Sequence, residues 1–251
     1  KIREGDPMLG IFTSIGGAIG TALSTAGTWL AGAAVKVGPA ITKFADGFLG
    51  VVAKIPGINI ETIKNVIEIA GKIISSICEL FGINSEDSAE ILGAKAEAAE
   101  KTMVDFDNDT EAYIKYLKEE IELDQAKFDE MSVEQKMGCK AIGIALETKA
   151  IEERIGGVRI TPEYIATLAK IHLGGKLNFS AQELVDIITG LKDAGITDMN
   201  EMTDYLEGRG ISDRVKTGQA LNSVLEKIDS GKNADEVVED MKQAVRRFGE
   251  E

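Results

Sequence analysis

The sequence has few of the residues that usually carry chemistry. It contains one histidine, His172, and two cysteines, Cys78 and Cys139. Two cysteines are too few for a disulfide-stapled secreted scaffold, and one histidine cannot supply the paired Glu-x-x-His motifs of a helical di-iron site. The motifs HExxH, CxxC, GxxxxGK[ST] and GxGxxG are absent. We therefore expect no enzyme activity, no cofactor and no small-molecule substrate.

The same three residues have ordinary structural interpretations. His172 closes an expected helix, and neither cysteine is surrounded by a nucleophile motif. We expect both thiols to be free and buried among apolar neighbours, although their spacing leaves a disulfide between them open.

Proline and aromatic residues are also scarce, with four prolines in the chain and 5% aromatic residues. Between the prolines the common residues are alanine, isoleucine, leucine, glutamate and lysine, which favour helix. No run of alternating β-branched residues is long enough to need a sheet. The composition predicts a mainly α protein, built as a multi-helix bundle.

Positive charge is in short supply, and the net charge is −14. Residues 1–57 contain five basic and three acidic residues, whereas the remainder contains 23 basic and 39 acidic residues. Because phosphate contacts need stripes of lysine and arginine, nucleic acid is excluded as a partner. Glu4 and Asp6, mixed with the first basic residues, argue against a signal peptide.

Charged residues are missing altogether from Met8 to Val35. As a helix this run would span about 42 Å, which is more than the roughly 30 Å of a bilayer core. Its length therefore permits a membrane segment, but its many glycines, threonines and serines make insertion marginal. We expect this apolar head to be hidden by lipid or by another subunit rather than by the rest of the chain.

Small residues recur at every fourth position of this run, at Gly16, Gly20, Ser24, Thr28 and Gly32. On a helix they form one stripe, which lets a second helix approach closely. Trp29 lies near one end of the run, where an interfacial indole or a packed core tryptophan would sit. The stripe and Trp29 are our candidates for a helix-packing or membrane segment.

Periodicity and capping signals divide the rest of the chain into further helices. Pro39 fits the first turn of one, and capping boxes begin at Ser132 and Ser180. Helices 110–131 and 133–155 are predicted to be antiparallel neighbours. The expected helices cover 38–57, 60–81, 85–104, 110–131, 133–155, 162–174, 181–192, 199–206, 213–229 and 235–248. We predict three sections, namely an apolar N-terminal section (1–82), a long-helix section (83–156) and a C-terminal helical subdomain (157–251).

An acidic loop is the best candidate for metal chemistry. Asp105, Asp107 and Asp109 match the first three ligand positions of a calcium loop. The loop fails at its sixth position, which is Thr110 instead of glycine, and at its twelfth, which is Tyr116 instead of glutamate. We expect no bound metal and favour a loop that caps the next helix.

Two functions fit these features best, and a helical enzyme with an unrecognised site stays open as a third. The first is a non-enzymatic structural or assembly protein of the virion, tail or injection-apparatus type, as a homo-oligomer or with other protein subunits. Residues Met8 to Val52 resemble, in composition only, the apolar stretches of phage tape-measure and ejection proteins. The alternative is an α-helical membrane-active protein, a pore former or delivered effector, that exposes residues 8–55 at a bilayer. The expected location is accordingly a virion, a secreted particle or a membrane.

Overall fold

The computed structural model describes residues 17–56, 59–83, 87–211, 213–228 and 233–248. These residues form α-helices, one short 3₁₀ helix and a single isolated bridge between Arg159 and Asp198. The predicted mainly α bundle is therefore confirmed. The elements are α2 (Gly17–Ala53), α3 (Ile60–Leu80), α4 (Ala89–Ala98), η1 (Met103–Phe106), α5 (Thr110–Glu120), α6 (Gln125–Glu130), α7 (Val133–Ile155), α8 (Pro162–Leu173), α9 (Ala181–Asp193), α10 (Asn200–Glu207), α11 (Arg214–Leu225) and α12 (Ala234–Arg247).

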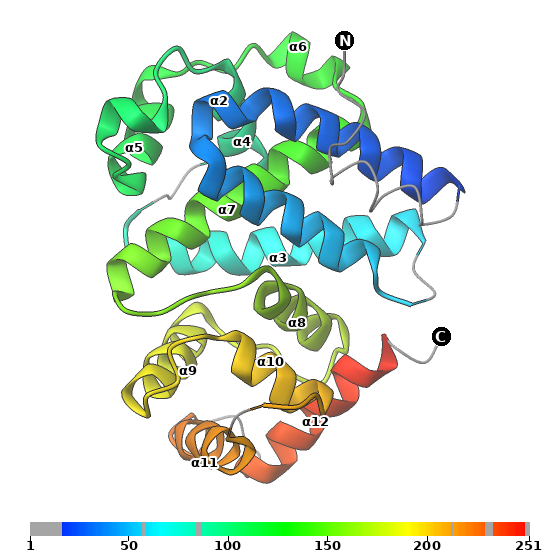
Figure 1. Ribbon diagram of the computed structural model, residues 1–251, viewed down its shortest axis with the longest axis vertical. Coiled ribbons are helices and arrows are strands. Elements are labelled where there is room, and N and C mark those ends of the chain that lie inside the picture. The colour runs from blue at the N-terminus through cyan, green and yellow to red at the C-terminus, as the bar shows by residue number, and fades with distance from the viewer. Residues whose placement is uncertain (1–16, 57–58, 84–86, 212, 229–232, 249–251) are drawn as a thin grey trace.

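Helix α7 is the central element of the fold. It packs most extensively against α4 and α2, and it also contacts α3 and α5 (Figure 1). Its bounds agree with the prediction, because Ser132 caps its first turn in a capping box with Gln135 and Gly156 ends it with a φ of 67°. The second predicted capping box, Ser180 with Glu183, is also present and begins α9.

Helix α2 bends at Gly38, where the backbone is not helical (φ 79°, ψ 166°). Glycine accepts this conformation without a steric penalty, and Pro39 then begins a second helical segment as predicted. From Ala22 to Val52 the inward face of α2 is buried, through Ala22, Ala26, Leu30, Ala33, Val37, Ile41, Ala45, Phe48, Leu49 and Val52. The expectation that the apolar head is not hidden by its own chain is thus wrong for this face.

No helix in the described part of the chain is both long enough and apolar enough to cross a bilayer.

The region between α3 and α7 is more broken than predicted. The expected helix 85–104 is reduced to α4 and η1, and the expected helix 110–131 is split into α5 and α6. The split occurs because Ile121 is extended (φ −103°, ψ 111°) and the Asp124 side chain accepts a hydrogen bond from the Lys127 N–H, which starts a new helix. Helix α7 accordingly has α4 and α2 as its main neighbours, rather than an antiparallel 110–131 helix.

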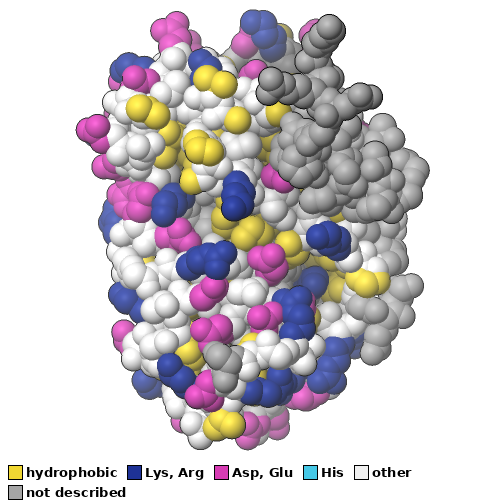
Figure 2. All heavy atoms as spheres, in the orientation of Figure 1, with side chains coloured by type: hydrophobic (Ala, Val, Ile, Leu, Met, Phe, Trp, Pro, Cys, Tyr) yellow, Lys and Arg dark blue, Asp and Glu magenta, His cyan; other side chains and the backbone are white. Residues whose placement is uncertain are grey.

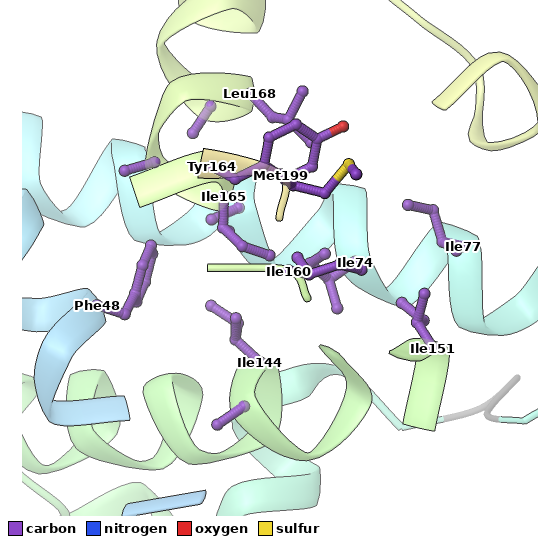
Figure 3. Close-up of a cluster of buried hydrophobic side chains, with 14 of the residues drawn as sticks. Phe48, Ile74, Ile77, Ile144, Ile151, Ile160, Tyr164, Ile165, Leu168 and Met199 are labelled. Atoms are coloured by element: carbon purple, nitrogen blue, oxygen red, sulfur yellow. The ribbon is translucent and has the colours of Figure 1, made fainter. Parts of the chain in front are cut away.

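Helices α8 to α12 gather on the side of α3 that faces away from α4 and α5 (Figure 1). Helix α8 packs against both α2 and α3. Figure 3 shows the resulting core, in which Phe48 of α2, Ile74 of α3 and Ile144 of α7 point toward Ile165 of α8. Hydrophobic packing therefore continues across the turn at Gly156 and Gly157. The three-section division itself stays a prediction.

Candidate functional site

The predicted small-residue stripe lies on the side of α2 that faces away from the core. Gly16 is outside the described residues, and Gly20 belongs to the first turns of α2. Ser24 is partly buried, whereas Thr28 and Gly32 are exposed. A Cβ atom at Gly32 would meet no other atom within 4 Å. The part of the stripe that can be placed is therefore open to a contact from outside and takes no part in the core.

Thr28, Ala31, Gly32 and Val35 together form what we call the outer face of α2. Their spacing of three and four residues places them on one side of the helix, and all four are exposed, Val35 to 77%. The nearest charged side chain in the sequence, Lys36, bends away and donates to the carbonyl oxygen of Ala99 at 2.6 Å. The outer face is consequently small and uncharged, in a protein of which 28% of the residues are charged.

Trp29 is partly buried and contacts α7. A Cβ atom at Gly138 would lie 2.8 Å from Cε3 of Trp29, so the indole fits against the bare backbone of that glycine. Trp29 also packs against the small cluster formed by Ala94, Phe128 and Cys139. Its indole thus has a packing role between helices in this structure.

Close helix packing through small residues does occur in the molecule, but between α4 and α7. A Cβ atom at Gly93 would lie 1.8 Å from the carbonyl oxygen of Cys139, and one at Gly143 would lie 1.8 Å from that of Ala89. Each helix thus places a small residue and a glycine four positions apart, at Ala89 and Gly93 and at Cys139 and Gly143. Sequence analysis missed this pair of motifs, although the spacing could have revealed it.

The three aspartates of the acidic loop do not converge. Asp105 accepts hydrogen bonds from the backbone and side chain of Thr102, at 2.7 and 3.0 Å, and these bonds lower its pKa. Asp109 caps α5 by accepting from the N–H of Ala112 at 2.9 Å, and Asp107 has a left-handed backbone (φ 54°). Nowhere in the described ranges do three or more acidic, cysteine or histidine side chains form a group that could hold a metal ion.

A half-buried ion cluster joins α3, α4 and α7. The ammonium of Lys140 contacts Glu68, and it contacts Glu90 at 2.9 Å. The hydrogen bond from Lys140 lowers the pKa of Glu68. Burial alone would lower the pKa of Lys140, but its hydrogen bonds to Glu68 and Glu90 outweigh burial and raise it. Glu68 and Lys140 are therefore held in their charged forms, which suits a structural bridge.

A second buried polar group lies farther along α3 and α7. Glu147 of α7 is fully buried, and its carboxylate accepts a hydrogen bond from the Ser75 hydroxyl at 2.9 Å. The thiol of Cys78 donates to the Glu147 backbone carbonyl at 3.6 Å. These contacts tie α3 to α7 and leave the thiol protonated.

None of the buried nucleophiles is activated. Both cysteines are free and buried, as expected, and burial raises the pKa of Cys78 strongly and that of Cys139 to about 12. Burial also raises the pKa of the Tyr113 and Tyr164 hydroxyls. His172 lies partly buried in the last turn of α8, and its ring makes no hydrogen bond to a described residue. The two thiols and the two tyrosine hydroxyls are therefore protonated, and so unreactive, at neutral pH.

Comparison of the chain with models of protein families, with curated proteins and with solved structures finds no match. A function must therefore be inferred from the geometry of this molecule alone.

Proposed function

We propose that this protein is a non-enzymatic structural subunit that packs through its helices within a larger complex, of the virion, tail or injection-apparatus kind. The observation that carries the proposal is the outer face of α2, which is exposed, uncharged and made of small side chains. In the three-section organisation predicted from the sequence, this face belongs to the apolar N-terminal section and provides its contact to a neighbour.

The occupant that best fits this face is the same face of a second copy. Gly32 leaves room for a partner's backbone to come close, and two identical small faces can meet around a two-fold axis. Because the face is uncharged, the contact itself places no like charges against each other, although each copy has a net charge of −14.

The size of the face predicts a weak contact. From Thr28 to Val35 the helix is about 12 Å long, whereas a stable interface buries roughly 800 Å² on each partner. We therefore expect a reversible dimer that forms at high protein concentration. In a particle, where many copies are held together, such a contact would be reinforced by its neighbours.

The state of the buried nucleophiles supports the non-enzymatic part of the proposal. The thiol pKa values of Cys78 and Cys139 are raised by burial, and the tyrosine hydroxyls of Tyr113 and Tyr164 are shifted in the same direction. None of these four groups can therefore serve as a nucleophile at neutral pH.

Sedimentation over a range of protein concentrations tests the proposal. The wild-type chain should self-associate, and Val35→Glu should shift it to monomer, because a charge in the centre of an apolar contact loses its hydration without gaining a partner. Val215→Glu is the matched control, since Val215 of α11 is a comparably exposed valine, at 69% against 77%.

Val215→Glu should self-associate as the wild type does. A wild-type chain that stays monomeric at the highest attainable concentration contradicts the proposal, as does equal self-association of wild type and Val35→Glu.

The membrane-active alternative requires α2 to leave the core of the protein. Exposure of residues 8–55 at a bilayer would require Leu30, Phe48 and the other buried side chains of α2 to leave their contacts in the core. Loosening the α2–α7 contact with Trp29→Ala should then increase flotation with anionic vesicles and dye release. If neither the wild type nor Trp29→Ala binds or permeabilises such vesicles, the alternative is excluded.

A further inference from the structure

A pocket lies where the ends of α2, α10 and α12 meet α8. Its volume is about 580 Å³, which is within the range of roughly 300–1,000 Å³ that small-molecule sites occupy. Five of the lining residues are apolar, namely Val51, Ile55, Pro56, Val245 and Phe248. The pocket therefore offers an apolar surface to a ligand of small size.

All other lining residues of this pocket are charged, and most are cations. They are Lys54, Lys170, Arg209, Arg246, Glu163 and Glu207. The lining thus has an excess of two positive charges in a protein whose net charge is −14. Figure 2, in the orientation of Figure 1, shows Lys and Arg side chains gathered over the lower part of the molecule, near α12. The local charge favours an anion as the ligand.

Two of the four cations are already paired within the protein. The carboxylate of Glu207 lies between Lys170 and Arg209, with Oε1 at 3.3 Å from Nζ of the lysine and Oε2 at 2.7 Å from Nη1 of the arginine. Arg209 also contacts Asp204 at 2.6 Å. This lysine and this arginine are consequently satisfied by carboxylates of the chain itself.

The other two cations, Lys54 and Arg246, are free. Both side chains are exposed, and neither makes an ion pair or a hydrogen bond with a described residue. Lys54 follows directly after α2, and Arg246 lies in the last turn of α12, where a cation also stabilises the helix dipole. That interaction is weak at an exposed position, and it leaves both charged groups accessible to an anion from solvent.

We propose that this pocket binds a small phosphate monoester with an apolar organic body. At neutral pH a phosphate monoester has a charge of about −1.5 to −2, which matches the excess of two positive charges in the lining. The guanidinium of Arg246 donates paired hydrogen bonds to the phosphate oxygens, and the ammonium of Lys54 contacts the same group as a point charge. The organic body lies against Val51 and Phe248.

This proposal does not depend on the assembly role, because the pocket and the outer face of α2 share no residue. Val35→Glu should therefore bind the phosphate ester as the wild type does, even though its self-association is lost.

Phenyl phosphate is a suitable probe, used at low ionic strength so that screening is weak. Calorimetric titration should show that it binds the wild type more tightly than benzoate, which has a single charge, and more tightly than inorganic phosphate, which has no apolar body. Phenol, which is uncharged at neutral pH, should not bind measurably. Added salt should weaken the binding of phenyl phosphate several-fold.

Two neighbouring arginines separate a binding role from a role at the helix end. Arg246→Glu should reduce the affinity for phenyl phosphate at least tenfold, because a carboxylate replaces a cation of the pocket. Arg247→Glu is the matched control, since Arg247 is also exposed, lies in the same last turn of α12 and does not line the pocket. Both changes alter the net charge and the helix end equally, so the melting temperatures of the two variants should agree.

Lys54→Gln should weaken binding three- to fivefold, because it removes one exposed ion pair to the phosphate. The proposal is overturned if phenyl phosphate does not bind the wild type, or if Arg246→Glu and Arg247→Glu weaken its binding equally. Equal affinity for phenyl phosphate and phenol would also overturn it, because the phosphate would then contribute nothing. Equal affinity for phenyl phosphate and inorganic phosphate would overturn the part assigned to the apolar wall.

Discussion

Gly143 of α7 lies directly against the carbonyl oxygen of Ala89 of α4, at a distance that leaves no room for a Cβ atom. In the reciprocal contact, Gly93 of α4 lies against the carbonyl oxygen of Cys139, which again leaves no room for a Cβ atom. Together these contacts fix the closest approach of two helices in the core.

We expect Gly143→Ala to destabilise the fold by about 3 kcal/mol, because the added methyl group forces two helix backbones apart. Gly32→Ala is the control, since Gly32 is exposed and has open space around it. That change should stabilise the protein by about 0.5–1 kcal/mol through the better helix propensity of alanine. Urea unfolding measures both effects, and equal midpoints for the two variants would show that the α4–α7 approach is not as close as described.

The ion cluster around Lys140 predicts a loss of about 1–2 kcal/mol for Lys140→Met, because Glu68 and Glu90 would lose the ammonium group that both carboxylates contact. The Lys140 side chain is 16% exposed. Glu68 is 45% exposed, and solvent screening therefore reduces the effect. Lys72→Met, which removes a partner of Glu68 that is 68% exposed, should change stability by less than about 0.5 kcal/mol.

The same cluster predicts a pH dependence. The folded pKa of Glu68 is lowered, so its contribution is present above the unfolded pKa of about 4.3 and is lost as the pH falls through the folded value. Lys140 matters at alkaline pH. Because its folded pKa is raised, its contribution to stability is lost only as the pH rises through that folded pKa. The stability difference between wild type and Lys140→Met should therefore shrink in acid. A difference that stays constant down to about pH 3 would contradict the assigned shifts.

Both thiols should resist alkylation in the folded protein. With a pKa of about 12, Cys139 has a thiolate fraction at neutral pH that is on the order of a thousandfold below that of a free cysteine. Cys78, whose pKa burial raises further, should be slower still. Labelling with iodoacetamide followed by mass spectrometry should show modification of both cysteines in urea and almost none without it. Rapid labelling of either one under native conditions would mean that its burial is transient.

The acidic loop should behave as a helix cap. Asp109→Ala should cost about 1 kcal/mol, because the N–H of Ala112 loses its acceptor. Asp107→Asn should be nearly neutral, since asparagine tolerates the left-handed backbone of Asp107. Calcium should leave the melting temperature of the wild type unchanged. A calcium-dependent rise that Asp107→Asn removes would favour a metal site over a cap.

Helix ends near strong local signals could be predicted closely. The bounds of α7 and α9 agree with the capping boxes at Ser132 and Ser180 because such caps involve residues only three apart. The break between α5 and α6 differs from the single helix predicted over 110–131, because one aspartate such as Asp124 can either interrupt the apolar face of a helix or cap the next one. The packing of α2 against α7 and α8 could not be predicted, because these helices lie about a hundred residues apart in the chain.

The sequence by itself determined that this protein is helical, where most helices begin and end, and that the run from Met8 to Val35 has no charge. Only the tertiary structure decided which side of that helix is buried. Before Lys36 both sides of α2 are uncharged, so no change from charged to apolar residues marks the side of Ala26 and Leu30 as the inner one and that of Thr28 and Gly32 as the outer one. The larger apolar side chains lie inward because their burial against α7 removes more apolar surface from water, and the small stripe is left outside as a consequence.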